Sequence, residues 1–299
     1  METKKGLFMK TIVQTLALIT FLGAPISLLA EKSMEELSKE IANPLAQIWN
    51  LSFQNNYTTV RSDLVDGEDH INTALFQPVL PIPLDNGMTA FARPVFTFIT
   101  APTKGYIGGT PSQPVAHGTD REAALGDLIL PVGVGVVQAK GWSYGIGATF
   151  IFPTSQHDLI ASHQYQVGPT ALALWANDDW MIGAHMQHWW GVAGDSDFDD
   201  KKQDFANHTD IQYFIVYHLP DAWQLRASPH ITYNWNAKSD NKLTLPVAFG
   251  FGKMFKVGPM PIMLMAEYQK SLVLPDDIGS DSTIMIQANF IIKNPFGDL

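Results

Sequence analysis

The chain has 299 residues and no cysteine, which excludes a disulfide framework and any metal site built on cysteine thiolates. Its formal net charge of −10 argues against nucleic acid as a partner, because phosphate binding needs a basic surface. Only 16% of the residues are charged, whereas soluble globular domains usually contain roughly 25%.

Residues 1–30 predict a secretory signal peptide. A basic start containing Lys4, Lys5 and Lys10 precedes the apolar run "TIVQTLALITFLGAPISLLA", and the polar "EKSMEE" follows it. We expect cleavage after Ala30; an N-terminal membrane anchor is the alternative interpretation. Export of a cysteine-free chain is compatible with a bacterial envelope.

Residues 31–48, "EKSMEELSKEIANPLAQI", predict a short helix that Pro44 interrupts. Their apolar positions share one helical stripe, which consists of Met34, Leu37, Ile41 and Leu45. This segment could lie in the periplasm or enter the protein as a plug. A frayed leader to the first strand is the alternative.

From residue 49 to residue 299, about twelve short segments alternate between an apolar and a polar face, as strands do. In residues 222–235, "AWQLRASPHITYNW", the odd-numbered positions from Trp223 to Trp235 are apolar or aromatic, and the even-numbered positions between them are polar. The other segments are 49–58, 72–82, 88–99, 125–138, 142–154, 164–176, 180–192, 208–219, 242–256, 261–272 and 282–293.

The connections between these segments alternate in length. Every second one is a short turn, "LDNG", "AKG", "NDD", "PDA" or "VGPM", and most of the others are longer and polar. Short turns at one end and long loops at the other are typical of an outer-membrane barrel. We therefore predict an all-β fold, a transmembrane antiparallel up-and-down β-barrel of about twelve strands over residues 49–299, with a short N-terminal helical segment.

In such a barrel the apolar face points to lipid and the polar face to the lumen. Trp223 and Trp235 would then lie about 30 Å apart along the membrane normal, one at each interface. A secreted β-sandwich is the alternative, but the polar faces are poor in Lys and Glu, unlike a solvated surface. The candidate lumen-lining residues are Arg93, His185, Gln187, His218, Arg226, His230, Glu267 and Gln269.

Several stretches resemble a known family: "ELSKEIANPLAQIWNLSFQNNY", "FQPVLPIPL", "GIGATFIFPT", "LTLPVAFGFGKMFKVG" and "ANFIIKNPF". They are similar to a bacterial envelope family whose members are often labelled neuromedin U or transporter. More loosely, they resemble the outer-membrane proteins of a phenol-degradation meta-pathway family. The resemblance spans residues 36–296. It implies an outer-membrane barrel that transports small or hydrophobic molecules, and it implies no catalytic residues.

The function predicted from these observations is a channel or transporter for small solutes, which the resemblance extends to hydrophobic or aromatic ones. The Gly- and Pro-rich loop 100–124 could fold inward as a constriction. The alternatives are a closed structural or adhesive barrel and an outer-membrane hydrolase. We predict no enzyme, because His230 and the nearby Ser228 lie on one face of one strand without a visible third catalytic partner.

We also predict no metal site and no cofactor. His185 and His188 are three residues apart, which puts them on opposite faces of a strand. Residues 195–204 are acidic but lack the Gly and Glu that an EF-hand loop requires, so we interpret them as a solvated external loop.

The expected location is the bacterial outer membrane. Its expected partners there are membrane lipid, lipopolysaccharide, the barrel-assembly machinery and a small solute. Outer-membrane barrels commonly end on an aromatic residue, whereas this chain ends in "NPFGDL". Phe290 or Phe296 would therefore have to serve as the assembly signal.

Overall fold

The computed structural model describes residues 32–64, 67–110, 112–155, 160–194, 197–198, 201–202 and 205–296. The predicted signal peptide and part of the acidic segment 195–204 lie outside these residues. Among the described residues, no helix combines the length and apolar character needed to cross a bilayer.

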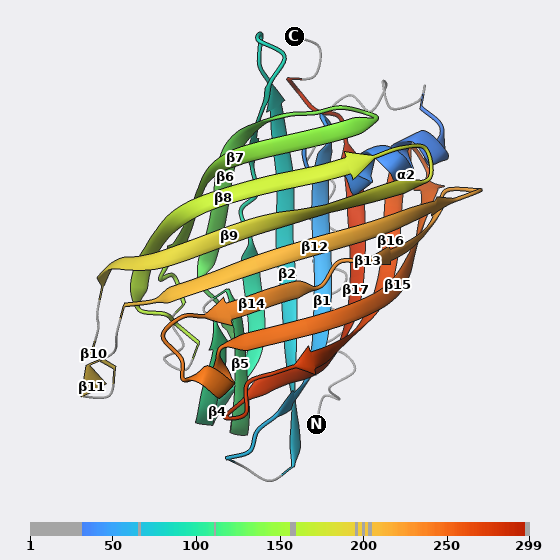
Figure 1. Cartoon of the computed structure of the whole chain (residues 1–299). Coiled ribbons are helices and arrows are strands. Elements are labelled where there is room, and N and C mark those ends of the chain that lie inside the picture. Colours follow the sequence, from blue (N-terminus) through green and yellow to red (C-terminus); the bar gives the residue numbers. More distant parts are fainter. Residues whose placement is uncertain are drawn as a thin grey trace, which may run out of the picture.

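The described chain is almost entirely β-structure (Figure 1). The strands are β1 (Trp49–Arg61), β2 (Glu68–Pro83), β3 (Thr89–Ala92), β4 (Phe96–Thr110), β5 (Gln113–Leu125), β6 (Leu128–Val136), β7 (Gly141–Phe152), β8 (Gln164–Ala176), β9 (Trp180–Gly194), β10 (Asp197–Phe198), β11 (Lys201–Lys202), β12 (Asn207–Leu219), β13 (Trp223–Ala227), β14 (His230–Asn234), β15 (Leu243–Val257), β16 (Met260–Val273) and β17 (Gly279–Ile292). The helices are α2 (Met34–Ala42) and a 3-10 turn at Ser239–Asn241.

The main sheet closes into a barrel, because β1 pairs antiparallel with both β2 and β17. Three barrel strands are interrupted along their length, so that β3 with β4, β5 with β6, and β13 with β14 each form one strand of the wall. Counted in this way, the barrel has 12 strands, all antiparallel to their neighbours. The predicted up-and-down barrel is confirmed.

The two faces of the wall differ as predicted. On β9, the side chains of Ile182, Met186 and Trp190 are exposed on the outside, whereas His185 and Gln187 are buried inside. A belt of exposed apolar side chains on the outer face is the surface that a transmembrane barrel presents to lipid.

Prolines occupy the places where the hydrogen-bond ladder is interrupted, a feature that the sequence left unexplained. Pro94 separates β3 from β4, and Pro78 lies opposite this break, where β2 pairs with neither. Pro169 lies where the pairing of β8 with β9 lapses, and Pro246 lies at a register shift between β15 and β16. Since proline has no N–H to donate, it is tolerated at such interruptions.

Segment 100–124 is not the loop expected from its Gly and Pro content. It forms the hairpin of β4 and β5, because its strands pair almost without interruption from Phe98 to Thr110. The hairpin bends into the barrel, where Val115 and Ala116 pack with Val60 and Ile278 on the inner wall. Figure 1 shows β4 and β5 behind β14 and β15, at the end of the barrel that carries the long loops.

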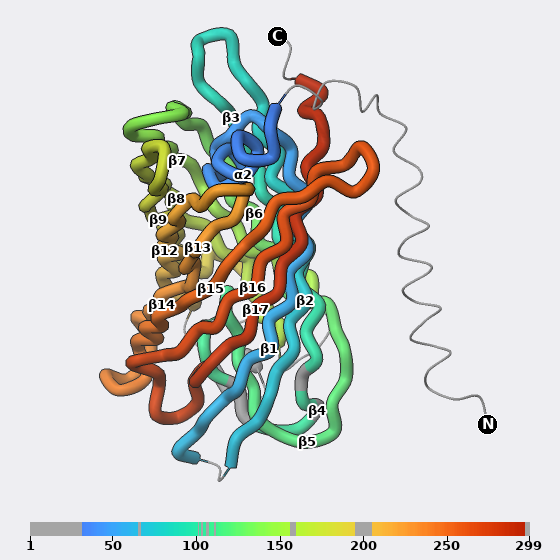
Figure 2. Tube along the Cα trace, turned by 90° about the vertical axis from the view of Figure 1, so that its right-hand side faces the viewer, coloured from blue at the N-terminus to red at the C-terminus, as the bar shows by residue number. Residues whose placement is uncertain are grey.

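Helix α2 lies at the opposite end, with the short turns (Figures 1 and 2). Ser33 caps it in a reciprocal pair with Glu36, and these hydrogen bonds hold the pKa of the Glu36 carboxyl below its usual value. The helix ends before Asn43-Pro44, as predicted. Its buried face packs inside the barrel, where Leu37 contacts a cluster that includes Met254.

Gly108 offers a test of the inward hairpin. A methyl group added at this position would overlap with the Ile278 side chain. We expect Gly108→Ala to lower the free energy of unfolding by about 1–3 kcal/mol, which is typical of overpacking in a filled interior. Urea titration of the refolded barrel, followed by tryptophan fluorescence, measures the loss.

The matched control is Ile278→Ala, alone and combined with Gly108→Ala. If the two side chains meet, the double variant loses less stability than the sum of the single ones. Strict additivity would contradict the packing described here.

Candidate functional site

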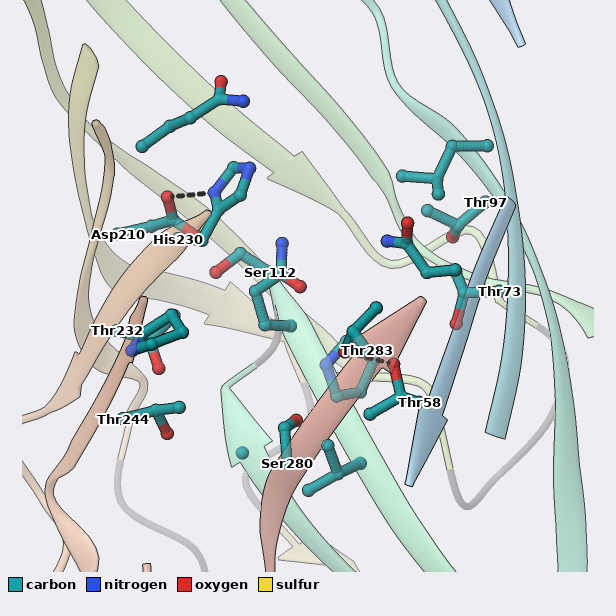
Figure 3. Close-up of a pocket in the computed structure, with 18 of the residues that line it drawn as sticks. Thr58, Thr73, Thr97, Ser112, Asp210, His230, Thr232, Thr244, Ser280 and Thr283 are labelled. Atoms are coloured by element: carbon teal, nitrogen blue, oxygen red, sulfur yellow. Dashed lines mark hydrogen bonds and ion pairs between the residues drawn. The ribbon is translucent and has the colours of Figure 1, made fainter. Parts of the chain in front are cut away.

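The barrel lumen contains a cavity of about 140 Å³ on the side of the long loops (Figure 3). The tip of the β4–β5 hairpin forms part of its wall, through Ser112 and Gln113. Figure 3 shows threonine and serine side chains around it from strands on several sides of the barrel. The labelled hydroxyl residues are Thr58, Thr73, Thr97, Ser112, Thr232, Thr244, Ser280 and Thr283.

A layer of side chains centred on Arg93 crosses the lumen on the side of this cavity that faces helix α2. Arg93 lies in the break between β3 and β4, and it donates from Nη2 to Gln77 Oε1 at 2.5 Å and from Nη1 to Gln212 Oε1 at 3.4 Å. Gln77 is on β2, and Gln212 is on β12, which lies on the far side of the barrel from β3 and β4. One guanidinium therefore connects two opposite walls.

The polar layer continues along both walls from Arg93. On one side, Gln77 donates to Gln54 Oε1 at 2.8 Å. On the other side, Gln212 Nε2 lies 3.4 Å from the carbonyl oxygen of Ser228, whose hydroxyl donates to Glu267 Oε2 at 3.0 Å. Gln54, Gln77, Arg93, Gln212 and Ser228 also line both lumen cavities, so this layer separates them.

Arg226 and Glu267 form an ion pair at the edge of this layer. Arg226 Nε lies 3.9 Å from Glu267 Oε2, and the Glu267 side chain is fully buried. Gly250 on β15 stands between them and is paired in register with both residues. Because glycine has no side chain, the two charged groups meet over β15.

The second cavity, of about 100 Å³, lies toward α2 and has a different lining. Ile41, Ala42 and Pro44 of the N-terminal segment contribute to it. The wall side chains on this side include Met181, Phe214, Val216, Met263 and Met265. The lumen therefore carries a methionine-rich apolar surface toward the helix, beside polar residues such as Asn50, Gln287 and Asn289.

The structure places the eight candidate residues as follows. Arg93, Gln187, His230 and Gln269 line the loop-side cavity, and Arg226 lines the helix-side cavity. Glu267 is buried beside them and accepts a hydrogen bond of 2.8 Å from Gln269. His185 is buried against Thr170, with 2.7 Å between Nε2 and Oγ1. His218 is buried near the short turns and lines neither cavity.

The candidate residues did not include several side chains of the site, among them Gln54, Gln77, Asp210 and Gln212. Asp210 is buried and bonds His230, with 2.7 Å between Oδ1 and Nδ1. The alternation of His208, Asp210 and Gln212 along β12 was a usable signal, since all three positions share one face. No comparable signal marked Gln77, because residues on both sides of it are apolar.

No metal centre is evident. Across the part of the chain that the structure describes, no group of three or more His, Asp or Glu side chains is arranged to hold an ion.

Comparisons with known proteins agree on the fold. No protein-family model matches the chain, and no curated protein matches it in sequence. Among solved structures, it is similar to the COG4313 outer membrane channel from Pseudomonas putida F1, with a TM-score of 0.58, 13% identity, and coverage of 82% of this chain and 93% of that one. The NanC porin (TM-score 0.48, 14% identity, 81% and 99% coverage) and a Pseudomonas aeruginosa FadL homologue (0.40, 10%, 84% and 93%) are more distant.

At these identities the likeness concerns the fold. A closed barrel with an even number of strands and an apolar outer belt is the architecture that crosses the bacterial outer membrane. The chain is thus an outer-membrane β-barrel, as predicted. The narrower family resemblance stays a prediction.

The Arg226–Glu267 pair predicts a stability effect. Glu267→Gln leaves the Arg226 charge without its buried partner, so we expect a loss of about 2–4 kcal/mol in the free energy of unfolding. The double variant Glu267→Gln with Arg226→Met, in which no charge is stranded, should recover part of this loss. Urea titration measures both. If the loss in the double variant equals the sum of the losses in Glu267→Gln and in Arg226→Met alone, the two charges do not interact.

Proposed function

We propose that this protein is an outer-membrane channel for small solutes, closed in the described conformation by its N-terminal segment and by the Arg93 layer. The observation that carries the proposal is the divided lumen. Two cavities lie along the barrel axis, and only side chains separate them. Side chains change rotamer far more easily than a barrel wall rearranges, so a path through the layer needs no change of fold.

The N-terminal segment is the proposed plug at the helix end. Its contacts with the wall are mostly apolar, and Leu45 packs with Leu172 and Phe214. Its polar contacts are hydrogen bonds outside the strand ladder: Gln224 Nε2 donates to the Ser38 carbonyl oxygen at 2.6 Å, the Asp221 N–H donates to Glu35 Oε1 at 2.9 Å, and Asn294 Nδ2 donates to the Gln47 carbonyl oxygen at 3.1 Å. A segment held in this way can withdraw without breaking the ladder of the barrel.

The residues that line the lumen indicate which classes of solute the proposed channel could accommodate. Hydrophobic or aromatic solutes, which the family resemblance implies, find apolar contacts in both cavities, and in the helix-side cavity methionines make these contacts adaptable. The loop-side cavity also offers hydroxyl and amide groups on several sides. A small solute would meet both, and the Arg93 layer would be the most selective point of its path.

A closed structural barrel is the second candidate. The hydrogen bonds that join Arg93 to both walls favour it, because small barrels are often filled by paired side chains. Contact with lipopolysaccharide at the long loops and assembly by the barrel-assembly machinery are part of either proposal.

Single-channel recording in planar bilayers distinguishes the two candidates. We expect small, infrequent stepwise openings from the native protein. Replacing Leu37 by Asp places a charge in the apolar contact of α2, and we expect the open probability to rise at least several-fold. Arg93→Ala should raise the unitary conductance, because it removes the bridge across the lumen.

Ile286→Ala is the control, since this side chain is exposed on the lipid face. It should leave both quantities unchanged. If all variants fold and insert, as shown by heat-modifiable migration on gels, but none conducts, the barrel is a closed one.

A further inference from the structure

The loop-side cavity has the size and enclosure of a binding site. Its volume of about 140 Å³ is close to that of an engineered cavity of roughly 150 Å³ that holds benzene. The hairpin tip at Ser112 bounds it on one side, and Arg93 bounds it on the other. A ligand of about six to eight non-hydrogen atoms therefore fits between the hairpin and the polar layer.

Hydroxyl and amide side chains form the largest class in the lining, and apolar side chains such as Ile71, Leu75 and Met285 lie among them. Thr73 and Thr97 contribute from β2 and β4, while Thr232 and Thr244 contribute from β14 and β15 (Figure 3). Each hydroxyl can both donate and accept a hydrogen bond, and so can each hydroxyl of a ligand. Donors and acceptors thus surround the cavity on several sides, which suits a molecule with hydroxyl groups along its length.

The charges of the lining cancel. Arg93 and Asp210 are the basic and the acidic residue of the lining, and their formal charges have opposite signs. Asp210 is already bonded to His230, and Arg93 is bonded to two glutamines. An ionic ligand of either sign would lose its hydration in this cavity and would also face a like charge, Asp210 or Arg93, in the same lining, which is costly.

His230 is held in a suitable orientation for a neutral ligand. When its Nδ1–H donates to the Asp210 carboxylate, Nε2 is left as an acceptor. Its side chain is 26% exposed and lines the cavity, whereas that of Asp210 is 2% exposed.

We propose that the loop-side cavity binds a small, uncharged polyol, and that this is the class of solute for which the channel is selective. This inference rests on the proposed function. The inference also narrows the proposed function, because the cavity favours hydroxylated solutes over the hydrophobic ones that the family resemblance implies.

Ligand-observed NMR titration of the folded protein in detergent tests the proposal with three four-carbon probes. Erythritol has four hydroxyl groups, 1,4-butanediol has two, and erythronate carries a carboxylate. We expect erythritol to bind most tightly. Thr73→Val and Thr232→Val replace a cavity hydroxyl by a methyl group of similar shape, so each should weaken erythritol binding by about 2- to 10-fold. Thr209→Val, on the outer face of β12, is the matched control and should change nothing.

The proposal is overturned if erythritol does not bind the folded barrel, if butanediol or erythronate binds as tightly, or if the cavity variants behave like the control. Single-channel conductance of the same preparations tests the proposed channel activity independently of erythritol binding. Conduction without erythritol binding refutes the polyol site alone. Erythritol binding without conduction supports the site and refutes the channel.

Discussion

The pairing of β1 with both β2 and β17 is the constraint on which the rest of this structure depends. Hydrocarbon offers no hydrogen-bond partner, so a sheet can cross a membrane only when it has no free edge. Closure also makes the two faces of every strand unequal. One face meets lipid and carries the exposed apolar residues, such as Phe249 and Ile284. The other is enclosed, and its polar side chains must satisfy one another.

The interior satisfies this requirement in two ways. Toward the long loops, amide and hydroxyl groups bond across the lumen through Arg93, and the buried carboxylate of Glu267 is paired with Arg226. Toward the short turns, the N-terminal segment supplies apolar side chains to an apolar wall, as Leu37 does against Met254 and Met263. The lining of the lumen therefore changes along its length. Toward the long loops it is rich in hydroxyl groups, and toward the helix the apolar side chains of the N-terminal segment and several methionines lie beside polar residues.

Interruptions of the wall are linked to this interior. At Pro94 the ladder between β2 and the next strand lapses, and the adjacent Arg93 is the residue that reaches across the lumen. At Pro229 a second strand breaks, and the adjacent Ser228 joins the same polar layer. In both places a proline removes a backbone donor from the wall, and a polar side chain beside it contributes hydrogen bonds to the interior.

The sequence by itself determined the strand count and the antiparallel order, because a period of two residues and the alternation of short turns with long loops are local properties. From the same period it predicted that Arg93, Arg226, His230 and Glu267 face the lumen. Only the tertiary structure decided which of these side chains meet. Arg93 and Gln212 are 119 residues apart, and their contact depends on the curvature and closure of the whole sheet. The sequence also could not predict that the β4–β5 hairpin folds inward or where α2 binds inside the barrel, since each depends on packing against strands distant in sequence.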